Sequence, residues 1–181
     1  MKQQKVNRLD VSDDVVQHDI RQHIEELEQR IKKIRTEIEE HINHGPDLKH
    51  KKELLLSIPG IGEKTMATVL SYFASIHRFN SAKKLAAFCG VAPREYQSGR
   101  SVKGRGSMSK IGSAHLRKSL FLPAMVALKY NQALKELKKR LSEKGKPKMV
   151  IIGTAMRKLI HIIYGMLKNN EPFDENKVFK A

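Results

Sequence analysis

The chain has 181 residues, of which 40% are hydrophobic, which predicts one modest core with an appendage. We find no uninterrupted apolar run near the roughly 20 residues that span a bilayer, and the polar start, Met1 to Lys5, has no signal-peptide pattern. A single cysteine, Cys89, excludes an internal disulfide and a cysteine-based zinc site. These features predict a cytoplasmic protein.

The net charge of +16 is unevenly distributed along the chain. Residues 1–46 contain 8 basic and 10 acidic residues, so that 27 basic and 9 acidic residues remain for residues 47–181. The two parts therefore carry net charges of −2 and +18. Such an asymmetry predicts a polyanion, and first of all a nucleic acid, as the partner of the second part. The alternative is a solvated basic surface on a helical protein.

A long helix is expected to begin at Ser12, which can serve as its N-cap, while Met1 to Leu9 should be frayed. Apolar residues then recur at alternating spacings of four and three, which predicts a heptad seam and a two-stranded coiled coil. The alternative is a long helix that packs on its own domain. Gly45-Pro46 should end this first domain, residues 1–46. The seam residues are Ile20, Ile24, Leu27, Ile31, Ile34 and Ile38.

The next helices are expected on both sides of Pro59-Gly60-Ile61-Gly62. Glycines at a sharp turn leave backbone N–H groups accessible, and this pattern is typical of a helix-hairpin-helix that holds a nucleic-acid phosphate. Gly60, Gly62 and Lys64 are therefore candidate phosphate-binding residues. The alternative is a plain corner between two helices.

Beyond the hairpin, Ser81 should cap a short helix, Ala82–Phe88, with Gly90 after its end. Residues 91–112 lose helical periodicity and are rich in glycine, serine and basic residues. Two short extended pieces are expected there, near Glu95–Gln97 and Ser101–Lys103, as at most a small β-hairpin.

Three further helices are expected, from about Ser113, over Asn131–Lys144 and over Met149–Leu167, with Pro123 kinking the first or ending its first half. The sequence therefore predicts a mainly α protein. An N-terminal coiled-coil helix is followed by a second domain, residues 47–181, which holds the helix-hairpin-helix and the basic loop.

Several blocks in fixed order give this second domain a specific resemblance. They include the Pro-Gly-Ile-Gly hairpin, Phe79 to Pro93, Ser98-Gly99 in the basic loop, and Ser109 to Leu120, followed by the closing helix. Over roughly residues 49–176 the chain resembles the C-terminal domain of insertion-sequence transposases of the IS116/IS110/IS902 family.

That resemblance implies DNA transposition through a covalent phosphoserine in a multimeric complex, guided by an element-encoded structured RNA. It also implies an N-terminal resolvase-like domain with a DEDD set of metal-binding acids. The blocks that match here begin only at the coiled coil, so we expect a truncated or split transposase. A divalent metal is expected in that other domain only, and no metal site or other cofactor is expected in this chain. A homo-oligomer through the coiled coil, in a bacterial or archaeal cytoplasm, is also expected.

The family position and the adjoining Gly99 and Arg100 make Ser98 the candidate nucleophile, because a serine needs exposure and nearby positive charge to attack a phosphodiester. Ser101, Ser107 and Ser109 are alternatives, and all four could instead be polar loop groups. Ser109 and Ser113 are better explained as helix-start caps. The expected nucleic-acid-binding residues also include Arg94, Arg100, Lys103, Arg105, Lys110, Arg117 and Lys118. His115 and Tyr96 remain candidates for contacts to nucleic acid.

Two functions remain open from the sequence. The first is a recombinase part that attacks DNA through Ser98. The second is a catalytically inactive, dimeric nucleic-acid-binding module. A ribosomal or repair-type hairpin protein is a third and weaker hypothesis.

Overall fold

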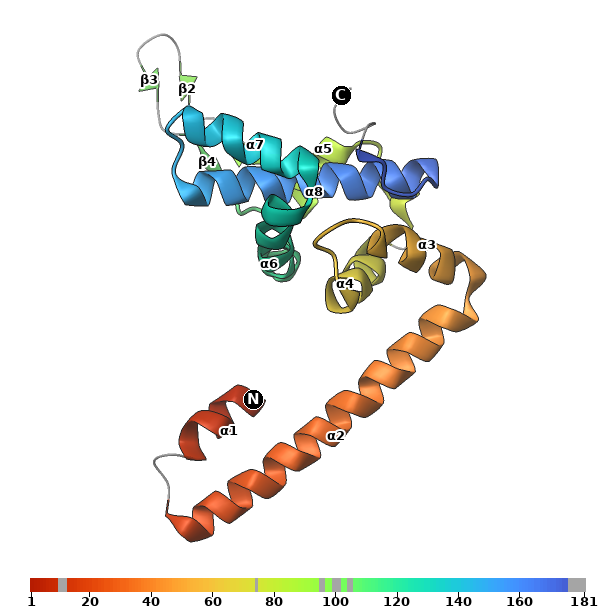
Figure 1. Ribbon diagram of the computed structural model, residues 1–181, viewed down its shortest axis with the longest axis vertical. Helices are drawn as coiled ribbons and strands as arrows, with labels where there is room; N and C mark the ends of the chain where they lie inside the picture. The colour runs from red at the N-terminus through yellow and green to blue at the C-terminus, as the bar shows by residue number, and fades with distance from the viewer. Residues whose placement is uncertain (10–12, 74, 95–96, 99–101, 104–105, 176–181) are drawn as a thin grey trace. The chain divides into compact units, whose positions relative to one another are not determined.

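The computed structural model describes residues 1–9, 13–73, 75–94, 97–98, 102–103 and 106–175, and for residues 97, 98, 102 and 103 it describes the backbone alone. Eight α-helices and one short 3₁₀ helix dominate the described residues (Figure 1). The predicted mainly α fold is therefore confirmed. Contacts divide the chain into two compact units, residues 1–46 and residues 47–181.

The first unit consists of α1 (Lys2–Leu9) and α2 (Asp14–His44). Helix α1 packs against α2, and Lys2 forms an ion pair with Glu28. The expectation of a frayed start was therefore wrong, because packing on α2 and this ion pair stabilise a helix that is too short to be stable alone. The N-cap of α2 is Asp13, without a side-chain cap, and Ser12 lies outside the described residues.

The residues of the predicted seam are buried or half-buried near the start of α2 and exposed farther along the helix. Ile20 is buried, and Ile24 and Leu27 are half-buried. Ile31, Ile34 and Ile38 are 39%, 54% and 43% exposed. The seam thus leaves a stripe of isoleucines open over its second half.

The second unit is built around α8 (Lys148–Asn169), which packs against α5 (Ala82–Phe88), α6 (Ala114–Tyr130), α7 (Gln132–Glu143) and the 3₁₀ helix η1 (Ile76–Arg78). With 22 residues, α8 is long and apolar enough to cross a membrane by length and composition, although Arg157 and Lys158 interrupt its apolar residues. More than half of its most apolar stretch is buried inside the protein, so α8 serves as the core helix.

Local signals set several helix boundaries in this unit. Ser81, Ser113 and Asn131 accept hydrogen bonds from the N–H groups of Lys84, Leu116 and Leu134, each at 3.3 Å. These side chains cap α5, α6 and α7, as Ser81 and Ser113 were expected to do. Pro123 does not end α6, which continues to Tyr130.

Helices α3 (Pro46–Leu56) and α4 (Glu63–Phe73) lie on either side of the Pro59–Gly62 turn. Helix α3 begins at Pro46 itself, because a proline suits the first helical position, where its missing N–H costs nothing. Ile61 is buried in the turn between the two helices.

Among the described residues, four two-residue strands make the β part of the fold. Strand β1 (Pro93–Arg94) pairs with β4 (Ser107–Met108), and β2 (Gln97–Ser98) pairs with β3 (Val102–Lys103), both antiparallel. The registers match Pro93 with Met108 and Ser98 with Val102. The small hairpin expected in the basic loop is therefore present, and its paired strands begin two residues before the expected Glu95.

Candidate nucleic-acid interface

The candidate nucleophile lies in the outer pair of strands. We call the strands β1 to β4 the β-arm, and Figure 1 shows β2 and β3 at its outer end. The backbone of Ser98 pairs with that of Val102, the outermost pair among the described residues of the arm. The backbone of Ser98 therefore lies on the β-arm, outside the helices of the core.

The base of the β-arm is fixed to the core. The N–H of Ser109 donates to the carbonyl of Ala92 at 2.9 Å, directly after the pair of Pro93 with Met108. Met108 is half-buried, and a Cβ added to Gly153 of α8 would lie 2.9 Å from its Cε atom. Because β4 packs this closely on α8, the arm begins from a rigid support.

The segment after the arm, residues 109–113, is held tightly although it has no regular structure. We call it the 109–113 loop. Its Lys110 and Gly112 have φ angles of 56° and 128°. A Cβ added to Gly112 would lie 2.4 Å from the carbonyl oxygen of Phe88, to which Ser113 N–H donates at 2.8 Å. The loop therefore packs against the C-terminal end of α5 by direct backbone contact.

Arg117 supports this loop from α6. Its Nη1 atom donates to the carbonyl of Lys110 at 3.0 Å, and the same atom would lie 2.5 Å from a Cβ added to Gly90. Gly90 has a φ of 68°, as expected for a residue that ends α5. The guanidinium of Arg117 thus holds the loop in place, a role that the sequence did not reveal.

The other residues that the sequence predicted fall into three groups. Lys64, Arg94, Lys110 and Lys118 are exposed. Lys103, like Ser98, is described by its backbone alone. Arg100, Arg105, Tyr96 and Ser101 lie outside the described residues. The structure thus brings Lys110, Arg117 and Lys118 to one segment, with Arg94 on the arm that leads to it.

The serines that the sequence weighed against Ser98 have other surroundings. Ser107 is exposed on β4, where its backbone pairs with Arg94. The hydroxyl of Ser109 accepts from the N–H of Ile111 at 3.4 Å, so it supports the 109–113 loop and caps no helix. Only Ser113 is the N-cap expected at this point.

The glycines of the helix-hairpin-helix turn differ in their surroundings. Gly60 has a φ of 105°, and an added Cβ would lie 2.9 Å from Ala127 and from the Pro123 carbonyl oxygen of α6. Gly62 is exposed, with no atom within 4 Å of an added Cβ. The first glycine therefore allows close helix packing, while the Gly62 side of the turn is open to a ligand. Phosphate binding at this turn stays a prediction.

The second unit carries a large excess of positive charge. Residues 78–168 contain 21 basic and 3 acidic residues, a net charge of +18. Among the described residues, no basic side chain from Arg78 to Lys168 forms an ion pair, whereas Lys33 and Lys51 pair with Glu37 and Asp47. Helices α5, α6, α7 and α8 also have no acid in their first turns, where one would be favourable. The surface of this unit therefore carries positive charge that is not neutralised by ion pairs among the described residues.

Two titratable side chains of the second unit have shifted pKa values. Burial lowers the pKa of His161, and the nearby Arg157, Lys158 and Lys83 lower it further. Burial raises the pKa of the Cys89 thiol to about 12. Because a nucleophilic cysteine acts as the thiolate, Cys89 is a packing residue, as the sequence indicated.

Sequence reasoning missed an aromatic pair on the surface. The rings of Tyr72 on α4 and His115 on α6 lie 6.1 Å apart between centroids, with an interplanar angle of 31°. Both residues are exposed. Ile111, which is 74% exposed, was also missed. The sequence signal for this exposed residue is an isoleucine between Lys110 and Gly112 in an otherwise polar segment.

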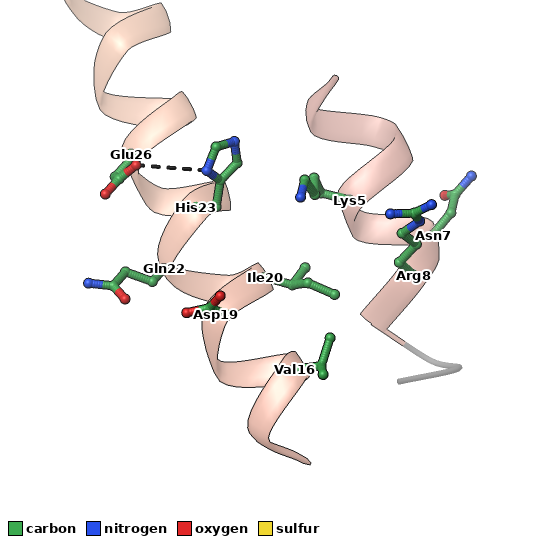
Figure 2. Close-up of a pocket in the computed structure, with 9 residues that line it drawn as sticks. All are labelled: Lys5, Asn7, Arg8, Val16, Asp19, Ile20, Gln22, His23 and Glu26. Atoms are coloured by element: carbon green, nitrogen blue, oxygen red, sulfur yellow. Dashed lines mark ion pairs between the residues drawn. The ribbon is translucent and has the colours of Figure 1, made fainter. Parts of the chain in front are cut away.

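A separate cleft of about 700 Å³ lies between α1 and α2 in the first unit (Figure 2). Basic side chains of α1, Lys5 and Arg8, line it together with Asp19, His23 and Glu26 of α2. The Nδ1 atom of His23 and the Oε2 atom of Glu26 lie 3.9 Å apart. In the part of the chain that the structure describes, no three His, Cys, Asp or Glu residues form a group suited to a metal ion. We therefore place no catalytic role in this cleft.

Comparison with known proteins identifies the second unit. Residues 52–139 match the family described as "Transposase IS116/IS110/IS902 family". A pilin gene-inverting protein of Moraxella bovis is 42% identical over 135 residues, which are 74% of this chain and 42% of the relative. The transposase for insertion sequence element IS1111A of Coxiella burnetii is 36% identical over 74 residues, 41% of this chain and 20% of that protein. The chain thus spans less than half the length of either relative.

Proposed function

Because this chain belongs to the transposase IS116/IS110/IS902 family, we propose that residues 47–181 hold DNA for an insertion-element recombinase. The Moraxella bovis relative is named for inverting a pilin gene, an outcome that requires cutting and rejoining DNA. Since the chain spans 42% of that relative, the reaction of the whole protein is part of this proposal.

The observation that carries the proposal is the positive charge between Arg78 and Lys168, where the described basic side chains form no ion pair. Duplex DNA carries about one negative charge per 1.7 Å of its axis. Lysine and arginine side chains that make no ion pairs within the protein can contact these phosphates without first breaking internal contacts. Arg94, Lys110 and Lys118 lie exposed in and beside the segment that links the β-arm to α6, where they support such contacts.

The finer proposal assigns the nucleophile to Ser98. Its hydroxyl oxygen attacks a DNA phosphorus and forms an O–P bond, while the bond from phosphorus to one strand oxygen breaks. The serine proton is lost and the released strand end gains one, so that the step is balanced without an oxidant. Nearby cations stabilise the charge on the non-bridging phosphate oxygens, and Arg94 is the exposed candidate on the arm.

The resemblance implies a divalent metal in a separate DEDD domain. The described residues of this chain contain no group of three acids or histidines that fits such an ion. We therefore derive no step through a metal here, and a guide RNA likewise remains an expectation from the resemblance.

The exposed seam of α2 favours a second candidate function, a dimeric nucleic-acid-binding module without catalysis. Ile31, Ile34 and Ile38 form an apolar stripe that is exposed to water in the single chain. A parallel coiled coil would bury these side chains. We propose that α2 joins two copies of the chain in either case. The two functions then differ in whether Ser98 forms an adduct.

DNA binding is tested by its salt dependence. We expect log K to fall linearly with log salt, with a loss of about 10³-fold between 50 and 200 mM if six phosphates are contacted. Lys110→Gln and Lys118→Gln should each reduce the slope by about 1, as measured by fluorescence anisotropy on a labelled duplex. Lys33→Gln on α2, which removes the partner of Glu37, is the matched control. Salt-independent binding, or equal slopes for all variants, would contradict the proposal.

Self-association is tested by Ile34→Glu. A carboxylate buried in a two-stranded seam is costly, so we expect this change to weaken the dimer about 100-fold or more in sedimentation equilibrium. Gln29→Glu adds the same charge on the outer face of α2 and should leave the dimer intact. A monomeric wild-type chain at all accessible concentrations would show that α2 packs elsewhere.

A further inference from the structure

Among the described large apolar residues of unit 2, Ile111 has the greatest exposure, at 74%. It stands between Lys110 and Gly112, whose backbone conformations are both left-handed. Such an exposed β-branched side chain is unusual beside a core that buries most of its isoleucines. Its position therefore needs a physical reason.

The exposure of Ile111 does not come from a loose loop. The Ile111 N–H is bonded to Ser109 Oγ at 3.4 Å, and the preceding carbonyl accepts from Arg117 at 3.0 Å. On the other side, Gly112 packs against the Phe88 carbonyl. The loop is thus held on both sides of the side chain, and an isoleucine with few rotamers loses little entropy when it is covered.

The charges around Ile111 indicate what covers it. Lys110 precedes it, Lys118 follows on α6, and both are exposed. Between Gln97 and Lys135 the sequence has no acidic residue. An occupant that offers apolar surface together with negative charge fits this surface, and stacked bases flanked by phosphates offer both.

We propose that Ile111 is a wedge that inserts between adjacent base pairs of duplex DNA while Lys110 and Lys118 contact the flanking phosphates. Isoleucine is among the side chains that unstack a base step in this way and kink the duplex. The inference rests on the proposed DNA-binding function and adds to it a residue that deforms the DNA. The kink would present an opened duplex beside the β-arm.

Duplexes with 2-aminopurine at several adenine positions test this inference, because the fluorescence of this base rises when it unstacks. We expect a rise of several-fold on saturation with the wild-type chain, and most of that rise to disappear with Ile111→Ala. We also expect affinity to fall about tenfold, while Ile111→Met keeps both effects. Leu122→Ala on α6, which removes a side chain that is 67% exposed, is the matched control and should change neither.

Each outcome separates the wedge from DNA binding in general. If Ile111→Ala retains the fluorescence rise and the affinity, the wedge is wrong while DNA binding stands. The same holds if the wild-type chain binds without a rise, or if Leu122→Ala is equally impaired. If only single-stranded RNA of the same sequence binds, or if the chain binds no nucleic acid, the proposed DNA-binding function fails and the wedge fails with it.

Discussion

Replacing Gly112 with alanine is expected to destabilise the second unit by about 3 kcal/mol. The φ of Gly112 is 128°, which a side chain rarely adopts, and its Cβ would lie 2.4 Å from the Phe88 carbonyl oxygen and 2.7 Å from that of Ala87. Because all the nearest atoms belong to the backbone, neither side can move without separating the 109–113 loop from α5. Urea unfolding followed by circular dichroism measures the effect.

Gly165→Ala is the matched control for this prediction. Gly165 lies within α8, and no atom outside its own helix lies within 4 Å of an added Cβ. Alanine there should stabilise the unit by about 0.5–1 kcal/mol, because glycine is unfavourable inside a helix. Equal effects from the two changes would mean that the loop does not pack on α5 as described.

Much of the fold could be predicted from the sequence because its signals are local. Ser81 and Ser113 cap helices that begin at the next residue, and Gly90 has the positive φ that a helix end requires. The heptad spacing identified α2 without a structure. Helix α1 was missed because its stability comes from packing on α2 rather than from its own eight residues.

The candidate site was harder to predict because its contacts join residues far apart in the sequence. Gly60 packs against Pro123 and Ala127, more than 60 residues away, which the sequence pattern of the turn did not predict. Arg117 donates to the Lys110 carbonyl, a contact that its predicted role toward phosphate did not include, and that role stays a prediction. Composition indicated a candidate segment, but only packing distinguishes a residue that supports the loop from one that remains open to a ligand.

Ser98→Ala is expected to abolish covalent attachment to DNA, with a loss of roughly 10³-fold or more, and to leave noncovalent binding within about twofold. In the proposed step the Ser98 oxygen forms the bond that joins the protein to the DNA phosphorus, whereas noncovalent binding depends on basic side chains. Denaturing gel electrophoresis with labelled DNA measures the adduct, and fluorescence anisotropy measures the binding. Ser107→Ala, which removes an exposed hydroxyl from the same arm, should affect neither.

The gel with labelled element-end DNA and Mg²⁺ tests the proposed function most directly, and it should be run with and without a resolvase-like DEDD domain supplied in trans. We predict a protein–DNA adduct that resists denaturation, requires Ser98 and survives Ser107→Ala. An adduct only with the added domain would show that the active site is shared between the two domains. An adduct lost with Ser107→Ala and kept with Ser98→Ala would contradict the assignment. No adduct in either mixture, with salt-dependent binding intact, would contradict catalysis and leave a dimeric nucleic-acid-binding module.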